Sequence, residues 1–257
     1  MPAAHPLVPA IAAAMRDAAV RLGCHPGLGE VAEVAGFTCI DAGLGVSSAN
    51  VALPSPSAGK ALPALRVVAE WFSNRGLNFR VDIPADAPSE LMAAAMALGL
   101  QFRERQPLML LEQNWPARRP ASLVIRPASS ANDAAAFAAI DALEYGDEPL
   151  IGTIVAAAAE DPRVLLFTGI LEGQPAARIA AMLHGELVTL HSLYVHPGLR
   201  RRGIGTEMTL AALAAAGEHG ARSAALLSTL TAVPLYERLG FRRIGDVIVM
   251  GCDAPLL

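Results

Sequence analysis

The residues best suited to chemistry lie at 190–208, where the chain reads LHSLYVHPGLRRRGIGTEM. A β-rich run ends at Pro197, three arginines follow, and Gly203 and Gly205 open an alanine-rich segment with helical character. The first turn of a helix leaves backbone N–H groups unpaired and carries partial positive charge. Glycines let the backbone approach a bulky phosphate, and arginines supply forked donors for its oxygens. This order predicts a phosphate-binding loop, and a solvated basic helix cap is the alternative.

These residues resemble the coenzyme loop of the GCN5-related N-acetyltransferase (GNAT) superfamily. Arg200-x-x-Gly203-x-Gly205 fits the family's R/Q-x-x-G-x-G/A pattern, which binds the pyrophosphate of acetyl-coenzyme A. Residues 232–241 fit a second family signature, A-x-x-L-Y-x-x-x-G-F. The resemblance covers roughly residues 122–252 and implies that acetyl-CoA is a co-substrate. The cofactor-binding residues that it implies are Leu193, Tyr194, Val195, Arg200, Arg201, Arg202, Gly203, Ile204, Gly205, Thr206 and Thr229.

The sequence departs from the family pattern at two places. Relatives often carry an Asn seven residues before the signature tyrosine, where this chain has Thr229, whose hydroxyl can still donate. In the first half, residues 54–60 read PSPSAGK where the loop would lie, so we expect no coenzyme there. The same segment also fails as a nucleotide P-loop, because the first glycine and the Ser/Thr after the lysine are missing.

Acetyl transfer to an amine needs a group that accepts a proton from the amine and one that protonates the leaving thiolate. The resemblance places Tyr236 beside the coenzyme sulfur, which makes this tyrosine the candidate acid. The alternative is a tyrosine packed on the sheet with its hydroxyl at the surface. We expect direct attack of the amine on the thioester.

The candidate base is His191, because an unperturbed histidine titrates at about pH 6.5. Alternation along a strand predicts that Thr189, His191 and Leu193 share one face. Arylalkylamine N-acetyltransferases, a branch of the family, carry paired histidines on this strand, and here the pair would be Thr189 and His191. A half-buried histidine with satisfied hydrogen bonds is the alternative, in which case water or another residue is the base.

An acidic segment precedes the helix at 151–160. In the family this region closes over the acceptor, so Glu144, Tyr145 and Asp147 are candidate substrate-binding residues. The carboxylates of Glu144, Asp147 and Glu148 would attract the ammonium form of a small-molecule or peptide amine. A solvated acidic loop is the alternative.

Short strands and amphipathic helices alternate along the chain, which is typical of an α/β (α+β) fold. We expect two GNAT-like mixed-sheet domains with helices on both faces, the N-terminal one truncated. The strands expected in the second half are 122–127, 164–172, 176–184, 187–195, 223–229 and 239–250. The helices expected there are 131–145, 151–160, 204–219 and a short one containing Pro234.

The two halves end in the same order of elements: strand, helix, Leu-Gly, long strand, with Gly99 and Gly240 in equivalent places. In the first half we expect a strand at 47–53, a helix at 62–75, a strand at 77–83, a helix ending at residue 98 and a strand to 112. This order predicts an internal duplication, with domains at 1–112 and 122–257 and a Pro-rich linker at 113–121. Chance resemblance between two α/β halves is the alternative.

Composition limits the function classes. The chain has 257 residues, 53% of them hydrophobic and 17% charged, with a net charge of −4. This balance argues against nucleic acid or membranes as partners. No apolar stretch approaches the roughly 20 residues of a membrane span, and no secretory signal is recognisable. Three scattered cysteines without CxxC spacing give no metal site.

We expect a cytoplasmic N-acetyltransferase, monomer or homodimer. The alternative is a non-catalytic acyl-CoA-binding or regulatory module.

Overall fold

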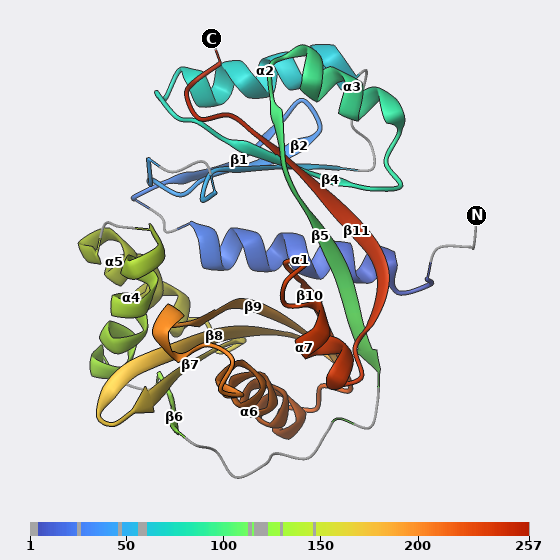
Figure 1. The fold of residues 1–257 in the computed structure, drawn as a ribbon. Coiled ribbons are helices and arrows are strands. Elements are labelled where there is room, and N and C mark those ends of the chain that lie inside the picture. Colours follow the sequence, from blue (N-terminus) through green and yellow to red (C-terminus); the bar gives the residue numbers. More distant parts are fainter. Residues whose placement is uncertain are drawn as a thin grey trace. The chain divides into compact units, whose positions relative to one another are not determined.

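The computed structural model describes residues 5–24, 27–45, 48–55, 61–112, 115, 123–128, 131–145 and 148–256 (Figure 1). The chain divides into two compact units. Unit 1 comprises Met1–Ala18 and Leu108–Ile244, and unit 2 comprises Ala19–Pro107 and Gly245–Leu257. The domains expected at 1–112 and 122–257 are consecutive in the chain, whereas these units exchange segments at both ends. Nearly all of the expected linker lies outside the described residues.

Unit 2 is a mixed sheet covered by two helices. Its strand order is β1-β2-β3-β4-β11, in which only β3 and β4 are parallel. Figure 1 shows both helices over one face of this sheet. The elements are β1 (Glu30–Val34), β2 (Phe37–Asp41), β3 (Val51–Pro54), α2 (Ala61–Ser73), β4 (Arg80–Pro84), α3 (Ser89–Ala97) and β11 (Arg242–Gly251).

Helix α2 forms where its apolar residues recur at helical spacing. Leu65, Val68 and Phe72 lie three or four positions apart, and all three are completely buried. The ring of Phe72 stacks on that of Phe79 just before β4, with 4.5 Å between their centroids. The helix is therefore fixed on the sheet by one apolar stripe.

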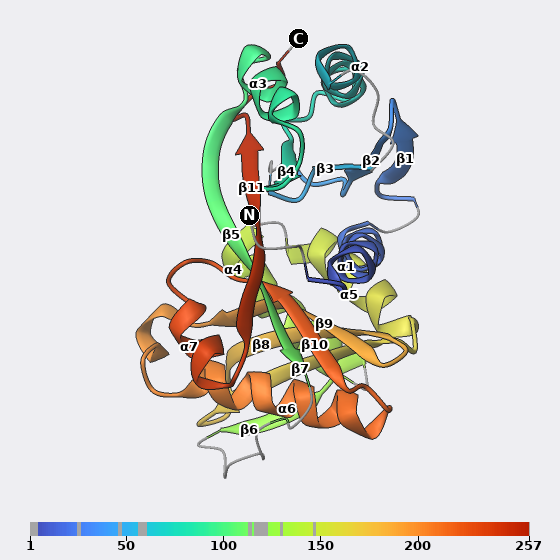
Figure 2. The same cartoon turned by 90° about the vertical axis from the view of Figure 1, so that its right-hand side faces the viewer.

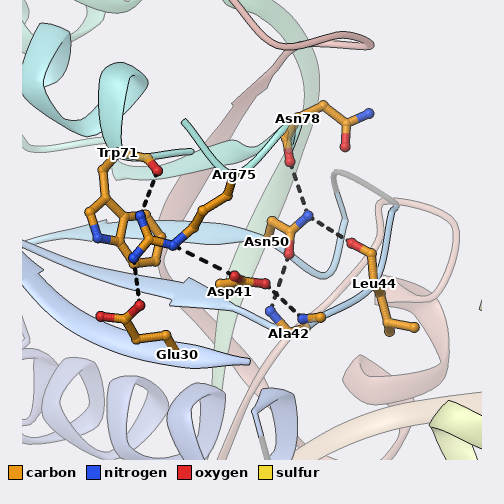
Figure 3. A network of polar contacts seen from close by, with 9 residues as sticks. Glu30, Asp41, Ala42, Leu44, Asn50, Trp71, Arg75 and Asn78 are labelled. Carbon is orange, nitrogen blue, oxygen red and sulfur yellow. Dashed lines mark hydrogen bonds and ion pairs between the residues drawn. The ribbon is translucent and has the colours of Figure 1, made fainter. Parts of the chain in front are cut away.

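A buried amide joins the loops at one end of the unit 2 sheet (Figure 3). The Asn50 side chain accepts a hydrogen bond from the Ala42 N–H at 3.2 Å. It donates to the carbonyls of Leu44 and Asn78, at 2.9 and 3.1 Å. Because Asn50 is completely buried, these bonds replace its contacts with water. One residue thus fixes the start of β3 to the two loops beside it.

Unit 1 has helices on both faces of its sheet. Its strand order is β5-β10-β9-β8-β7-β6, in which only β9 and β10 are parallel. Helix α6 packs on one face of β7–β9 (Figure 2). On the other face, α4 packs on β7 and β8, and α5 packs on β7. The elements are α1 (Val8–Gly23), β5 (Gln101–Glu112), β6 (Val124–Pro127), α4 (Ala131–Tyr145), α5 (Glu148–Glu160), β7 (Val164–Leu171), β8 (Gln174–His184), β9 (Leu187–Val195), η1 (Pro197–Leu199), α6 (Ile204–Glu218), β10 (Ser223–Leu227) and α7 (Val233–Arg238).

The halves of the chain exchange their last strands. The first half runs β3-α2-β4-α3-β5 and the second runs β9-α6-β10-α7-β11. Strand β5 pairs with β10 in unit 1, and β11 pairs with β4 in unit 2. The eleven strands within the described residues therefore follow a single hydrogen-bonded order, and the expectation of two separate mixed sheets is corrected to one mixed sheet. The repeated element order supports the predicted duplication.

Two parts of the first half were not predicted: helix α1 and the β1–β2 hairpin. The buried residues of α1 are Ile11, Ala14 and Ala18, so its apolar face is weakly marked in an alanine-rich segment. Three elements precede β3 and five precede β9, so in the described residues the first half is the shorter copy. No helix in the described ranges combines the length and apolarity that crossing a bilayer requires.

Candidate active site

Strand β9 contains a bulge in the middle of the predicted site. Ala180 of β8 pairs with His191, but Arg178 pairs with Tyr194, so β9 has one more residue than β8 over this stretch. Ser192 lies within the bulge, and its φ of 54° is in the left-handed region that L-residues avoid. Such an inserted residue bends a strand and changes where its later side chains point.

The bulge reverses the alternation of side chains along β9. Tyr194, and not Leu193, shares the face of His191, since Tyr194 and His191 pair with β8 residues two positions apart. The side chain of Leu193 packs with the core beneath α6. The prediction that His191 and Leu193 share one face is therefore wrong, because strand alternation alone does not reveal an inserted residue.

Beyond the bulge, β9 parts from β10. The last parallel pair joins Leu190 to Leu226, whereas β9 stays paired with β8 as far as Val195 opposite Ala177. Residues 193–195 of β9 therefore have no strand partner on the β10 side within the described sheet. One of their carbonyls, that of Val195, accepts a hydrogen bond from Arg200 Nε. Backbone groups left without a strand partner are those with which an extended ligand arm can pair.

The predicted phosphate-binding loop leads directly into α6. Gly203 stands at the N-cap with a φ of 84°, and no side chain caps this end of the helix. The first backbone bond of the helix runs from the Glu207 N–H to the Gly203 carbonyl, at 3.1 Å. The N–H groups of Ile204, Gly205 and Thr206 precede it, and the helix dipole adds positive charge there.

Arg200 is held beside this helix end. Its Nε donates to the Val195 carbonyl at 3.0 Å, and its guanidinium carbon lies 5.8 Å from the centroid of the Tyr194 ring. Arg201 and Arg202 are exposed. All three arginines of the loop are therefore exposed, and Arg200 is held against β9 by its hydrogen bond.

Gly205 lets three elements meet closely at this helix end. A Cβ at this position would lie 2.9 Å from a Leu235 methyl carbon, 3.7 Å from Leu193 and 3.8 Å from Val195. The loop, β9 and α7 are thus in contact. The contact also places Tyr236, the next residue of α7, in the same neighbourhood.

Comparison with known proteins bears on this arrangement. Residues 106–241, more than half of the chain, match the model of the acetyltransferase (GNAT) family. The chain belongs to this family. The predicted resemblance is confirmed.

Solved structures of GNAT proteins share the fold over most of the chain. A GCN5-related N-acetyltransferase from Kribbella flavida is 20% identical with a TM-score of 0.68, each chain being 95% covered. A tandem GNAT protein from the clavulanic acid biosynthesis pathway is 14% identical with a TM-score of 0.60, over 89% of this chain and 84% of that one. At these identities the likeness concerns the fold alone. No curated protein matches the chain.

In this GNAT chain the candidate acid, Tyr236, is nearly buried. It is 6% exposed and packs edge-on against Phe241, with 5.5 Å between the ring centroids. Burial raises the pKa of its hydroxyl above the ordinary value, so the phenol stays protonated at neutral pH. No described residue hydrogen-bonds this hydroxyl.

The candidate base, His191, lies on the face of β9 opposite α6. Burial, and secondarily the charge of His184, lowers its pKa to about 4. Its Nε2 is buried and has no hydrogen-bond partner among the described residues. The expected pKa near 6.5 is therefore corrected: His191 is neutral at pH 7 but holds an added proton weakly.

Thr189 occupies the position of the second histidine of the arylalkylamine branch. It is hydrogen-bonded to His184 of the neighbouring strand β8. His184 Nε2 lies 3.1 Å from Thr189 Oγ1, and its Nδ1 lies 3.6 Å from a carboxylate oxygen of Asp17 in α1. Sequence reasoning missed His184 and Asp17, because only strand pairing and the position of α1 bring them to this face.

The remaining predicted site residues are less defined. Thr229 is exposed after β10, and its hydroxyl lies 3.1 Å from that of Thr231. Glu144 and Tyr145 end helix α4, but their side chains, like all of Asp147, lie outside the described part of the chain. Their predicted role in substrate binding stays a prediction.

Sequence reasoning also missed Arg178. Its side chain is completely buried on the face of His191 and Tyr194. A single charged residue inside the otherwise apolar run at 176–183 was the available signal, since arginine is rarely buried without a partner.

Proposed function

We propose that this chain is an acetyl-CoA-dependent N-acetyltransferase that acetylates a primary amine at one site, in residues 122–257. The observation that carries the proposal is the uncapped N-terminus of α6, entered through Gly203 and flanked by Arg200. Backbone N–H groups and a guanidinium at one helix end are suited to a diphosphate.

The residues present are suited to two parts of coenzyme A, its diphosphate and its pantetheine arm. The N–H groups of residues 204–206, with Arg200–Arg202, would hold the diphosphate, and the hydroxyl of Thr229, two residues after the end of β10, would donate to the arm. The backbone of 193–195, unpaired on the β10 side, would hydrogen-bond the pantetheine arm. Bound there, acetyl-CoA supplies a thioester between β9 and β10.

The candidate catalytic residues lie on opposite faces of the sheet at this opening. His191 is on the face away from α6, whereas Tyr236 belongs to the core beneath α6. An amine approaching on the His191 face would form the C–N bond as the C–S bond breaks. His191 accepts the amine proton, and Tyr236, protonated at neutral pH, donates a proton to the thiolate.

A second candidate function is that of a non-catalytic acyl-CoA-binding module. The observation that favours it is the low pKa of His191, about 4, because so weak a base gives little driving force for removing a proton from an ammonium group. In that case coenzyme binding would persist without turnover.

Two glycines that flank α6 provide a matched test of binding. Gly203 and Gly220 stand at opposite ends of the helix with φ of 84° and 88°, and nothing lies within 4 Å of a Cβ added at either. Gly203→Val should abolish acetyl-CoA binding in isothermal titration calorimetry, while Gly220→Val carries the same backbone strain and should bind as the wild type does. Equal affinities in both variants would exclude a diphosphate at this helix end.

Turnover is tested by a panel of amines monitored through release of free thiol. If the chain is an N-acetyltransferase, at least one amine should cause release of free thiol, and the His191→Gln variant should lose this release. Binding of acetyl-CoA without thiol release from any amine would favour the non-catalytic module.

A further inference from the structure

The bulge of β9 is bound by a buried guanidinium. Arg178 of β8 is completely buried, and its Nη1 donates to the carbonyl of Ser192, the bulge residue with positive φ. Its Nη2 forms an ion pair with Asp141 of helix α4. Arg178 therefore connects the irregular part of β9 to the helix that covers this face.

Aromatic rings enclose the same guanidinium. Its central carbon lies 5.7 Å from the centroid of Phe137 in α4 and 5.6 Å from that of Tyr194, the first regular residue after the bulge. Tyr194 is in turn 5.8 Å from the guanidinium of Arg200 in the predicted diphosphate loop. These contacts link α4, the bulge and the loop in one series.

A contribution to the stability of the fold does not by itself explain a buried ion pair next to a strained residue. Removing a guanidinium and a carboxylate from water costs free energy that their attraction often only offsets, and the left-handed backbone of Ser192 adds strain. Both costs arise around the bulge of β9, and β9 parts from β10 there. Bringing Arg178 to the Ser192 carbonyl holds the strained conformation in place.

We propose that Arg178, oriented by Asp141, is a positioning residue that maintains the β9 bulge and thereby keeps residues 193–195 open to the pantetheine arm. This inference rests on the proposed function for its ligand. Without the hydrogen bond from the guanidinium, the left-handed conformation of Ser192 would be less stable relative to a regular extended one. A regular β9 would turn Leu193 away from α6 and extend pairing toward β10, closing the coenzyme site.

The test compares two arginines that each form an ion pair with a buried aspartate. Arg80 of unit 2 forms an ion pair with Asp82, which is 8% exposed, at 3.1 Å, and it belongs to no part of the proposed site. Arg178→Met should raise the Kd for acetyl-CoA at least tenfold and raise KM for acetyl-CoA more than it lowers kcat. Arg80→Met should lower the melting temperature without changing either constant, and Arg178→Lys should recover part of the affinity.

A milder variant covers the case in which Arg178→Met does not fold. Asp141→Asn keeps the shape of the side chain and removes its charge, so it should weaken acetyl-CoA binding less than Arg178→Met, by about threefold to tenfold. If the variants at Arg178 and Asp141 that fold bind acetyl-CoA as tightly as Arg80→Met does, the bulge does not depend on this pair and the proposal is overturned.

Hydrogen exchange separates this proposal from the proposed function. Without ligand, the amides of 191–196 should exchange at a changed rate in Arg178→Lys or Asp141→Asn, whereas those of β7 should not. If the wild type fails to bind acetyl-CoA but these amides respond, the proposed function falls and the structural role of Arg178 stands. Unchanged exchange at 191–196 refutes the role of Arg178 whatever the ligand.

Discussion

The pKa of His191 makes the stability of this protein depend on pH in a defined direction. In the folded chain the pKa is lowered to about 4, whereas an unfolded histidine has a pKa of about 6.5. The unfolded state therefore binds the proton more readily, so this residue's contribution to stability is present above pH 6.5 and is lost as pH falls towards 4. Replacing His191 with glutamine removes the titrating group and should remove this loss.

Linkage gives the size of the effect. From these two pKa values, His191 lowers the free energy of unfolding by about 2 kcal/mol between pH 8 and pH 5, and by about 3 kcal/mol once pH is below 4. His184 is the group whose charge acts on His191, and it forms a connected set with Asp17 and Arg163 on this side of unit 1. The variant retains all three, so the difference between the two proteins isolates His191.

The measurement is urea unfolding followed by circular dichroism, for the wild type and His191→Gln, at pH 8 and pH 5. The wild type should lose about 2 kcal/mol more than the variant across this interval. The control is His219→Gln at the exposed C-terminal end of α6, which tests for a general effect of removing a histidine. Parallel losses in wild type and His191→Gln would mean that His191 titrates normally and is not buried as described.

Three further predictions concern single side chains. Asn50→Ala should lower the free energy of unfolding by about 2–4 kcal/mol, because it leaves the buried backbone partners of Asn50 without a hydrogen bond. Thermal unfolding measures this loss, and a loss below about 0.5 kcal/mol would contradict the prediction. Tyr236→Phe should keep the fold, since no described residue bonds the hydroxyl, yet lower kcat about 10–100-fold in the thiol-release assay; an unchanged kcat would remove Tyr236 as the acid. Arg200→Met should raise the Kd for acetyl-CoA about tenfold by calorimetry, through loss of charge-assisted bonds to the diphosphate; an unchanged Kd would exclude that contact.

Local sequence pattern predicted most elements because their residues have the right period and clear ends. The strand at Leu187–Val195 and the helix at Ala131–Tyr145 were placed with the bounds that the structure has. The pairing of the long strands was not predictable in this way, because the Leu-Gly turn at Gly99 or Gly240 predicts that a strand follows but not which strand it pairs with. Exchange of β5 and β11 between the halves depends on contacts far apart in sequence.

The structure also suggests why only one half would bind coenzyme. In the first half, β2 and β3 pair in unbroken register from Phe37 opposite Pro54 to Ile40 opposite Val51, and β2 contains no arginine, whereas β8 carries Arg178. A regular strand pair needs no buried guanidinium to hold it. The second half has both the bulge and the arginine, so the two features occur together. This difference, together with the loop sequence, supports a single site in the second half. A loop that binds the diphosphate is not sufficient, because the coenzyme arm also needs a strand whose backbone groups are not already paired with a neighbouring strand.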